Sequence, residues 1–269
     1  MGCALVELNE PDVAGFLSML KSGSRNVYGR GLKAFQQFYE SQGSVRDFLD
    51  RVERNRFLPR RERQRVAIET LNRFVVWLQS YGYAPKTVRV HVGAVQSLAK
   101  FYEIPISLRY VHLPPAQPIY KKHPWTEVGL FIASMDKPMY RSIAASILQS
   151  GLSISDVLAL TYGDIKEEFE KGVTPLCLDL TRRKTGVPFI TFLGGWSVEL
   201  LKDYLANRKL EDETPNNVSV RTVHAYFRQE AQKFAGAFKG RSPYSPHSLR
   251  AAFRTFLSDH KVDPLYIEY

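Results

Sequence analysis

The sequence has little cysteine and no long apolar run. Cys3 and Cys177 are the only cysteines among 269 residues, too few for a disulfide framework or a zinc cluster and typical of a reducing compartment. No apolar stretch approaches the roughly 18 residues of a membrane span, and the N-terminus lacks the basic segment of a secretion signal. We therefore expect a soluble intracellular protein and exclude a small secreted scaffold.

The familiar signatures of nucleotide and metal enzymes are also missing. The sequence contains no Gly-x-x-x-x-Gly-Lys-Ser/Thr, Gly-x-Gly-x-x-Gly, His-Glu-x-x-His or Cys-x-x-Cys motif. Nucleotide hydrolysis, dinucleotide chemistry and a zinc site therefore have no support. We expect no metal and no small-molecule cofactor.

What the sequence has in excess is positive charge. Lys and Arg number 37 against 27 Asp and Glu, a net charge of +10. Residues 1–112 carry +7 of this and residues 113–269 carry +3. Seven arginines fall between Arg51 and Arg65, a run that is either a solvated helix face or a phosphate-binding surface. A basic domain indicates an acidic partner, with nucleic acid ahead of acidic proteins or membranes.

Apolar periodicity predicts a helical first domain, residues 1–104. Tyr28, Leu32, Phe35 and Tyr39 recur at helical spacing, and similar stripes follow through residue 102. Between residues 105 and 124 the periodicity fails and five prolines accumulate beside Lys121 and Lys122. This composition predicts a proline-stiffened linker lying along something acidic.

Residues 125–269 predict a second domain that combines helices with one hairpin. Two alternating apolar stretches, 176–181 and 187–193, flank a turn containing Arg182, Arg183 and Lys184. Ser245-Pro246 opens a helix on which His247 and Arg250 share a face. The fold class is therefore mainly α with a small β-hairpin. Taken singly, Lys184 reads as a solvated turn residue and His247 with Arg250 as a surface pair.

The order of these features resembles the tyrosine recombinase, or phage-integrase, family. Ser150 to Ile165, with Gly151-Leu152-Ser153 and Asp156, is similar to the family's first box, which reads Gly-Leu-Arg-x-x-Glu/Asp before a Leu-x-Leu. A hairpin Lys follows, and Pro246-His247-Ser248-Leu249-Arg250 is similar to the His-x-Leu-Arg second box. Ser24 to Tyr28, and Lys86-Thr87-Val88-Arg89, resemble two helices of the family's core-binding domain. The resemblance covers nearly the whole chain.

The resemblance implies a helical, SAM-like core-binding domain and a catalytic domain of the DNA breaking-rejoining fold, which together form a C-shaped clamp on duplex DNA. It implies strand exchange through a 3′-phosphotyrosyl intermediate, without metal or cofactor. Lys184 would protonate the leaving oxygen, and His247 and Arg250 would hold the phosphate. Asp156 matches the acidic position of the first box. The DNA-binding residues it implies are Ser24, Arg25, Arg60, Arg61, Lys86, Thr87, Arg89, Lys121, Lys122, Arg182 and Arg183.

Two departures bear on catalysis. Ser153 occupies the first-Arg position, where Ser153-x-x-Asp156 is typical of a helix cap. Loss of one phosphate-binding Arg costs on the order of 10³ to 10⁵ in rate, by analogy with arginine fingers. The chain also ends before the family's Gly-His box and nucleophilic Tyr, and we expect Tyr266 and Tyr269 to pack rather than attack.

We therefore expect a site-specific recombinase or integrase of a mobile element that binds duplex DNA and does not cleave it. The alternative is an inactive, integrase-like regulator or accessory protein, and a third hypothesis is a helical enzyme acting on small acidic metabolites. The implied partners are double-stranded DNA and further copies of the chain on DNA, with a monomer in solution and no membrane. The expected location is the cytoplasm at the nucleoid, or the host cell of a virus or plasmid.

Overall fold

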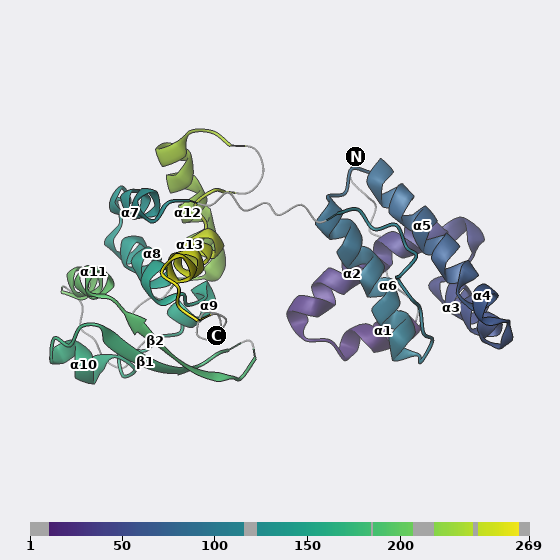
Figure 1. Cartoon of the computed structure of the whole chain (residues 1–269), viewed down its shortest axis with the longest axis horizontal. Coiled ribbons are helices and arrows are strands. Elements are labelled where there is room, and N and C mark those ends of the chain that lie inside the picture. The colour runs from purple at the N-terminus through teal and green to yellow at the C-terminus, as the bar shows by residue number, and fades with distance from the viewer. Residues whose placement is uncertain (1–10, 116–122, 184, 207–217, 239–241, 264–269) are drawn as a thin grey trace. The chain divides into compact units, whose positions relative to one another are not determined.

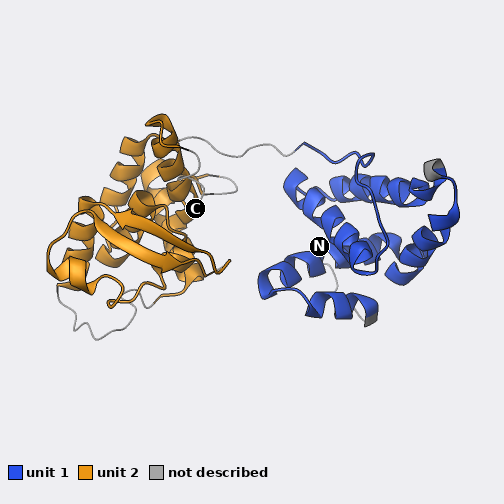
Figure 2. Ribbon diagram, turned by 60° about the horizontal axis from the view of Figure 1, so that its bottom comes forward, with its two compact units in different colours: residues 1–119 blue, residues 120–269 orange. Residues whose placement is uncertain are grey.

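The computed structural model describes residues 11–115, 123–183, 185–206, 218–238 and 242–263. The chain divides into two compact units, residues 1–119 and 120–269 (Figure 2). The described residues are mainly helical, with one two-stranded antiparallel sheet in unit 2 (Figure 1). This confirms the fold class that the periodicity predicted. None of the helices in the described ranges is long and apolar enough to cross a membrane.

Unit 1 is a helical bundle whose helices follow the apolar stripes of the sequence. Its elements are α1 (Pro11–Ser18), α2 (Ser22–Tyr39), η1 (Glu40–Gln42), α3 (Val45–Arg54), η2 (Asn55–Phe57), α4 (Arg60–Arg63), α5 (Arg65–Ser80) and α6 (Pro85–Phe101). Phe35 of α2 lies at the centre of the core, with its ring centroid 5.0 Å from that of Phe48 and 5.1 Å from that of Phe74. All three rings are fully buried, so the aromatics of the stripes build the core, as expected.

Helices α2 and α6 pack unusually close together because of Gly31. A Cβ atom at this position would lie 3.0 Å from both the Ala94 Cβ and the His91 Cα. Only a residue without a side chain allows the two backbones to approach this closely without displacing one of them. The spacing of α2 and α6 matters because a groove opens between them.

The segment that we expected to be a linker belongs partly to unit 1. Ile106 and Val111 are buried in the core of the unit. Gln64 both donates to the Pro105 carbonyl (2.7 Å) and accepts from the Ser107 amide (2.9 Å), and Asn72 accepts from the amide of His112 (2.7 Å). Side-chain amides thus satisfy backbone groups of a segment that has no secondary structure of its own. We expected a proline-stiffened linker over residues 105–124, and in the structure the segment up to residue 115 packs against unit 1. Residues 116–122, including Lys121 and Lys122, lie outside the described residues.

Unit 2 is built around one central helix, α8. The unit contains α7 (Trp125–Ala133), α8 (Pro138–Ser150), α9 (Ile154–Val157), α10 (Lys166–Glu170), β1 (Leu176–Thr181), β2 (Pro188–Leu193), α11 (Gly195–Leu205), α12 (Val220–Ala235) and α13 (Pro246–Asp259). Helix α8 is buried on nearly every face and packs against α7, α9, α11, α13 and β2. The buried positions of α8 are aliphatic or small, including Ser142, Ser146 and Ser150, which suits a helix at the centre of a domain.

The hairpin forms where alternation predicted it. Strands β1 and β2 pair antiparallel, with Leu176 opposite Leu193 and Thr181 opposite Pro188. Leu176, Leu178 and Leu193 are fully buried against the helices, whereas Ile190 and Phe192 are exposed on the other face. The sheet therefore has one face on the core and one in solvent.

Candidate nucleic-acid interface

The first box and the second box meet in unit 2 through Gly151. This residue ends α8 with a left-handed backbone (φ 66°). A Cβ atom there would lie 2.4 Å from the Phe253 Cδ1 of α13. Glycine is thus required twice at this position, for its conformation and for the contact with α13. The contact places the start of the first box against the helix that carries the second.

Ser153 serves as the N-cap of α9. Its Oγ accepts a hydrogen bond from the Asp156 amide (3.3 Å) and donates one to the Asp156 Oδ2 (2.7 Å). This is the helix-cap geometry that the sequence predicted. Asp156 is buried beside it, with 7% of its surface exposed. The Ser153 hydroxyl is therefore engaged in a local cap and carries no charge.

Helix α13 begins with a capping box and presents both residues of the second box. Ser245 and Ser248 exchange side-chain to backbone hydrogen bonds, and Pro246 occupies the first turn. His247 is exposed in that turn, and Arg250 lies one turn further and is half-buried. The start of α13 is thus defined by Ser245 and Ser248, which flank His247 and precede Arg250.

Three other charged side chains act electrostatically on Arg250. Burial lowers the pKa of the Arg250 guanidinium, the positive charges of Arg182 and Arg254 lower it further, and the carboxylate of Asp156 opposes the shift. The structure thus brings together a residue of the first box, one of the hairpin and two of α13. We call Asp156, Arg182, Arg250 and Arg254 the arginine cluster. Guanidinium groups held near one another in this way are suited to a phosphate, whose charge relieves their repulsion.

The hairpin lies next to the first box. A cavity of about 170 Å³ is lined by residues of both, among them Asp156 and Asp164 on one side and Thr181 and Arg183 on the other. Lys184, which the resemblance assigns as the proton donor, lies outside the described residues. Arg183 is exposed, and Arg182 is half-buried.

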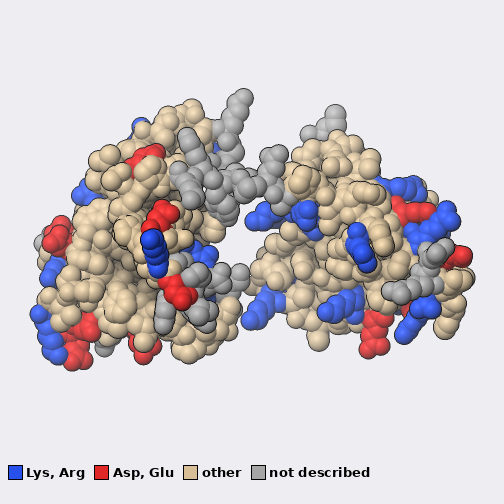
Figure 3. Space-filling model, in the orientation of Figure 1, with Lys and Arg blue, Asp and Glu red and all other residues tan. Residues whose placement is uncertain are grey.

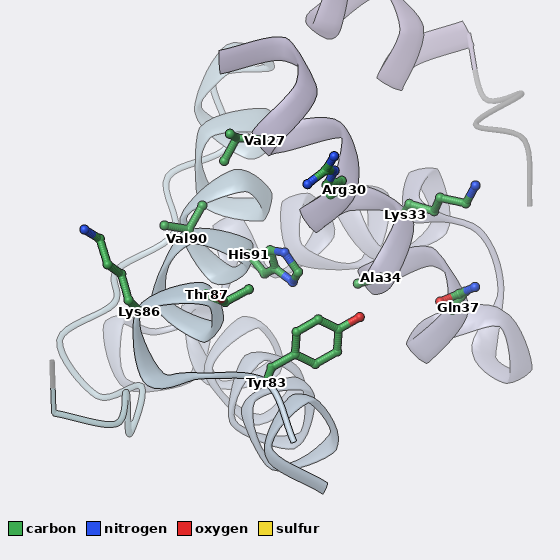
Figure 4. Close-up of a pocket in the computed structure, with 10 residues that line it drawn as sticks. All are labelled: Val27, Arg30, Lys33, Ala34, Gln37, Tyr83, Lys86, Thr87, Val90 and His91. Atoms are coloured by element: carbon green, nitrogen blue, oxygen red, sulfur yellow. The ribbon is translucent and has the colours of Figure 1, made fainter. Parts of the chain in front are cut away.

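Unit 1 contains a basic groove between α2 and α6. The groove has a volume of about 640 Å³ and is lined by Val27, Arg30, Lys33, Ala34, Gln37, Tyr83, Lys86, Thr87, Val90 and His91. Figure 4 shows His91 and Tyr83 between the two helices, whereas Lys33 and Lys86 reach outwards on opposite sides. An apolar floor with cations at the rim suits a ligand that presents both apolar edges and phosphates, as DNA does in its major groove.

His91 lies at the bottom of the groove. It is 6% exposed, and its Nδ1 has no hydrogen-bond partner among the described residues. Burial lowers the pKa of His91 below its usual value. The edge of the Tyr83 ring packs against it at a centroid distance of 5.3 Å. His91 was not among the residues that the sequence pattern singled out.

The structure separates the expected DNA-binding residues of unit 1 into two groups. Lys86 and Thr87 line the groove. Arg25, by contrast, donates to the carbonyl oxygens of Leu17 and Ser18 at the end of α1, both at 3.0 Å. Ser24, exposed in the first turn of α2, is not among the groove residues. The Nε of Arg89 is also used structurally, because it donates to the Pro114 carbonyl at 2.7 Å.

The arginine run from Arg51 to Arg65 lies away from the groove, over α3, η2, α4 and α5. Exposed ion pairs join Arg56 to Glu53 (3.9 Å) and Arg65 to Glu69 (2.7 Å). The backbone places Arg60 and Arg61 at the start of α4. Part of this run is therefore an ordinary solvated helix surface, the simpler of its two interpretations.

Three residues that the sequence analysis missed line the groove or join the arginine cluster. Arg30 and Lys33 stand beside the apolar stripe of α2, three residues apart, a spacing that marks one helix face and was available in the sequence. Arg254 follows Arg250 by one turn and was available in the same way. In the described ranges, no group of three or more His, Cys, Asp or Glu side chains could hold a metal ion.

Comparison with solved structures identifies the class of fold. It is the tyrosine recombinase fold, at identities of 15% or less. The match to a lambda integrase dimer bound to a COC′ core site covers 95% of this chain and 88% of the integrase chain, with a TM-score of 0.63 and 15% identity. The match to the Tn1549 transposon integrase in complex with a circular intermediate DNA covers 89% of this chain and 90% of the integrase chain (TM-score 0.57, 13% identity). The match to the XerH site-specific recombinase bound to its difH substrate covers 76% of this chain and 62% of the XerH chain (TM-score 0.54, 15% identity).

No protein-family model matches the chain, and no curated protein matches its sequence. The similarity therefore lies in the fold.

Proposed function

We propose that this chain binds duplex DNA in the manner of a site-specific recombinase, with the groove of unit 1 on the bases and the arginine cluster of unit 2 on a phosphate. The observation that carries the proposal is the contact between the first box and α13. Gly151 packs against Phe253 of α13, the helix that carries His247 and Arg250, and the charges of Asp156, Arg182 and Arg254 act on Arg250. The lambda and Tn1549 integrases compared above are in complex with DNA, which supports the same function.

The charge of unit 1 supports a DNA-binding role. The face of unit 1 in Figure 3 carries more Lys and Arg than Asp and Glu, and residues 1–112 have a net charge of +7. DNA binding by such a surface releases counterions, so its affinity falls steeply with salt. An enzyme acting on small metabolites would show a much flatter salt response, which separates the two functions.

Salt titration of DNA affinity tests the role of the groove. The matched pair is Lys86→Ala, in the groove, and Lys100→Ala, an exposed position about 21 Å further along the same helix. We expect Lys86→Ala to reduce the slope of log affinity against log salt by about 0.9 and Lys100→Ala to leave it unchanged. Fluorescence anisotropy with a labelled duplex measures both slopes. Equal effects of the two substitutions would place the DNA elsewhere on unit 1.

We also propose that residues 1–269 bind DNA without cleaving it. Ser153, at the position where the resemblance places a catalytic Arg, is engaged in the cap of α9 and supplies no charge to a transferring phosphate. A nicked duplex that traps covalent intermediates should therefore yield no protein–DNA adduct on a denaturing gel. An adduct would favour an active recombinase over an accessory protein. The lambda integrase neighbour is a dimer on its DNA, and we include pairing of copies on DNA in the proposal.

A further inference from the structure

The floor of the groove in unit 1 carries one polar side chain that forms no hydrogen bond with the described residues. His91 lines the groove, is 6% exposed, and lies between α2 and α6 in Figure 4. Of its two ring nitrogens, Nδ1 is enclosed and has no partner in the described part of the chain. Nε2 is not enclosed within these residues, so it is the nitrogen that a molecule in the groove can reach.

Small residues of α2 lie beside the edge of the ring that carries Nε2. A Cβ atom at Gly31 would lie 3.3 Å from Cδ2 of His91, the ring atom bonded to Nε2. Ala34, about one turn further along α2, also lines the groove and contributes only a methyl group. The Tyr83 ring packs against the imidazole at a centroid distance of 5.3 Å and an interplanar angle of 63°. The ring is thus packed in place, and little side-chain volume lies beside its Nε2 edge.

The surroundings of the two nitrogens determine which of them carries the proton. Burial lowers the pKa of His91, so above about pH 6.5 the ring has a single N–H. An enclosed N–H without an acceptor carries the full cost of a lost hydrogen bond, and enclosed donors of this kind are rarer in proteins than enclosed acceptors. The proton therefore belongs on Nε2 and the lone pair on Nδ1. The floor of the groove thus presents a hydrogen-bond donor.

We propose that the Nε2–H of His91 donates a hydrogen bond to N7 of one purine when DNA occupies the groove, so that His91 selects the base sequence. The inference rests on the proposed function, in which this groove contacts the bases. Adenine and guanine both present N7 as an acceptor in the major groove, whereas cytosine presents an N4 donor and thymine a methyl group beside its O4. Lys33 and Lys86 at the rim suit phosphates, which carry no sequence information. His91 therefore favours a purine at one position of the site.

A scan with 7-deazapurines on the full chain tests this contact. The probe is a duplex that the wild-type chain selects from a randomised library, with each purine in turn replaced by its 7-deaza analogue, which has carbon in place of N7. At one position the replacement should weaken binding of the wild-type chain about fivefold and that of His91→Phe less than about twofold, since Phe keeps a ring there without the donor. If no 7-deaza penalty is lost in His91→Phe, the inference is wrong.

Lys86→Ala is the matched control, because Lys86 lines the rim of the same groove. It should weaken binding to every duplex and leave the 7-deaza penalty at the selected purine unchanged. Loss of that penalty in Lys86→Ala as well would assign it to the general fit of the groove and overturn the role of His91.

Histidine-selective ¹⁵N labelling of the wild-type chain gives a second test that does not depend on how a variant folds. We expect Nε2 of His91 to carry the proton in the free chain, and its N–H to become protected from exchange with water when the duplex binds. A proton on Nδ1, or an Nε2–H that exchanges equally fast in the complex, would contradict the inference.

These measurements also separate the inference from the function on which it rests. If the chain does not bind duplex DNA, or binds it with a flat salt response, the proposed function is wrong and the role of His91 falls with it. If DNA binds with a steep salt response while no 7-deaza penalty depends on His91, the function stands and His91 is not a base contact.

Discussion

The ionisation of a single residue in this molecule depends on its burial as well as on its own chemistry. His91 is the clearest case, because an ordinary titratable side chain lies almost fully buried below a groove rimmed by Arg30, Lys33 and Lys86. Burial lowers the pKa of His91 in the folded protein, whereas an unfolded chain keeps the ordinary value near 6.5. The unfolded state therefore binds the proton more readily.

This difference predicts that unit 1 loses stability as the pH falls below about 6.5, with a slope of at most about 1.4 kcal/mol per pH unit. Above that pH His91 is neutral in both states, and its contribution is constant. Hydrogen exchange of α2 and α6 between pH 7.5 and 5.5, corrected for the intrinsic rate, measures the effect on the intact chain. His91→Asn should remove this part of the pH dependence. A slope that persists in the variant would assign it to other groups.

At the scale of elements, short polar signals position the candidate ligands. Helix α13 starts where Ser245 and Ser248 complete a capping box, and this start determines where His247 and Arg250 lie. The N-cap of α9 does the same for Asp156. The local hydrogen bonds at the starts of α9 and α13 therefore help to set the positions of Asp156 and Arg250.

Removal of the α13 cap should destabilise the helix that carries the second box. We expect Ser245→Ala to reduce the unfolding free energy of unit 2 by about 1 kcal/mol, since the N-cap loses the acceptor of the Ser248 amide. Ser258→Ala, an exposed position near the other end of α13, is the matched control and should cost less than about 0.5 kcal/mol. Hydrogen exchange of α13 peptides in both variants measures the difference. Equal costs would show that the capping box does not stabilise the helix start.

The whole molecule contains two hydrophobic cores, each lying within one unit. One core runs from Val13 to Val111 and the other from Val128 to Ala252, among the described residues. Both contain fully buried phenylalanines, including Phe35 in unit 1 and Phe131 in unit 2. Units with separate cores unfold as separate cooperative units unless an interface couples them.

This organisation predicts two unfolding transitions that respond to different substitutions. Phe35→Ala should cost unit 1 about 3 to 5 kcal/mol and lower one transition, and Phe131→Ala should lower the other by a similar amount. Scanning calorimetry of the full chain resolves both. If either substitution shifted both transitions equally, the two units would be coupled energetically.

The sequence by itself determined the elements and the charge of this protein. Helical and alternating periodicity depend on residues a few positions apart, so the helices of unit 1, the hairpin and the caps at Ser153 and Ser245 could all be predicted. The order of the boxes similarly pointed to the fold that the solved structures share. Net charge, a sum over residues, needs no structure.

Only the tertiary structure decided which side chains are available to a ligand. Arg25 and Arg89, which the sequence suggested as DNA ligands, are exposed and also donate to backbone carbonyls of segments that pack beside them. Part of the segment 105–124, which looked like a linker, packs onto the core of unit 1 through Ile106, Leu108, Val111 and Leu113. His91, which the sequence pattern did not single out, is buried and lines the floor of a groove. Each of these outcomes depends on contacts between segments far apart in the chain, where burial and hydrogen bonding are set by packing and not by local periodicity.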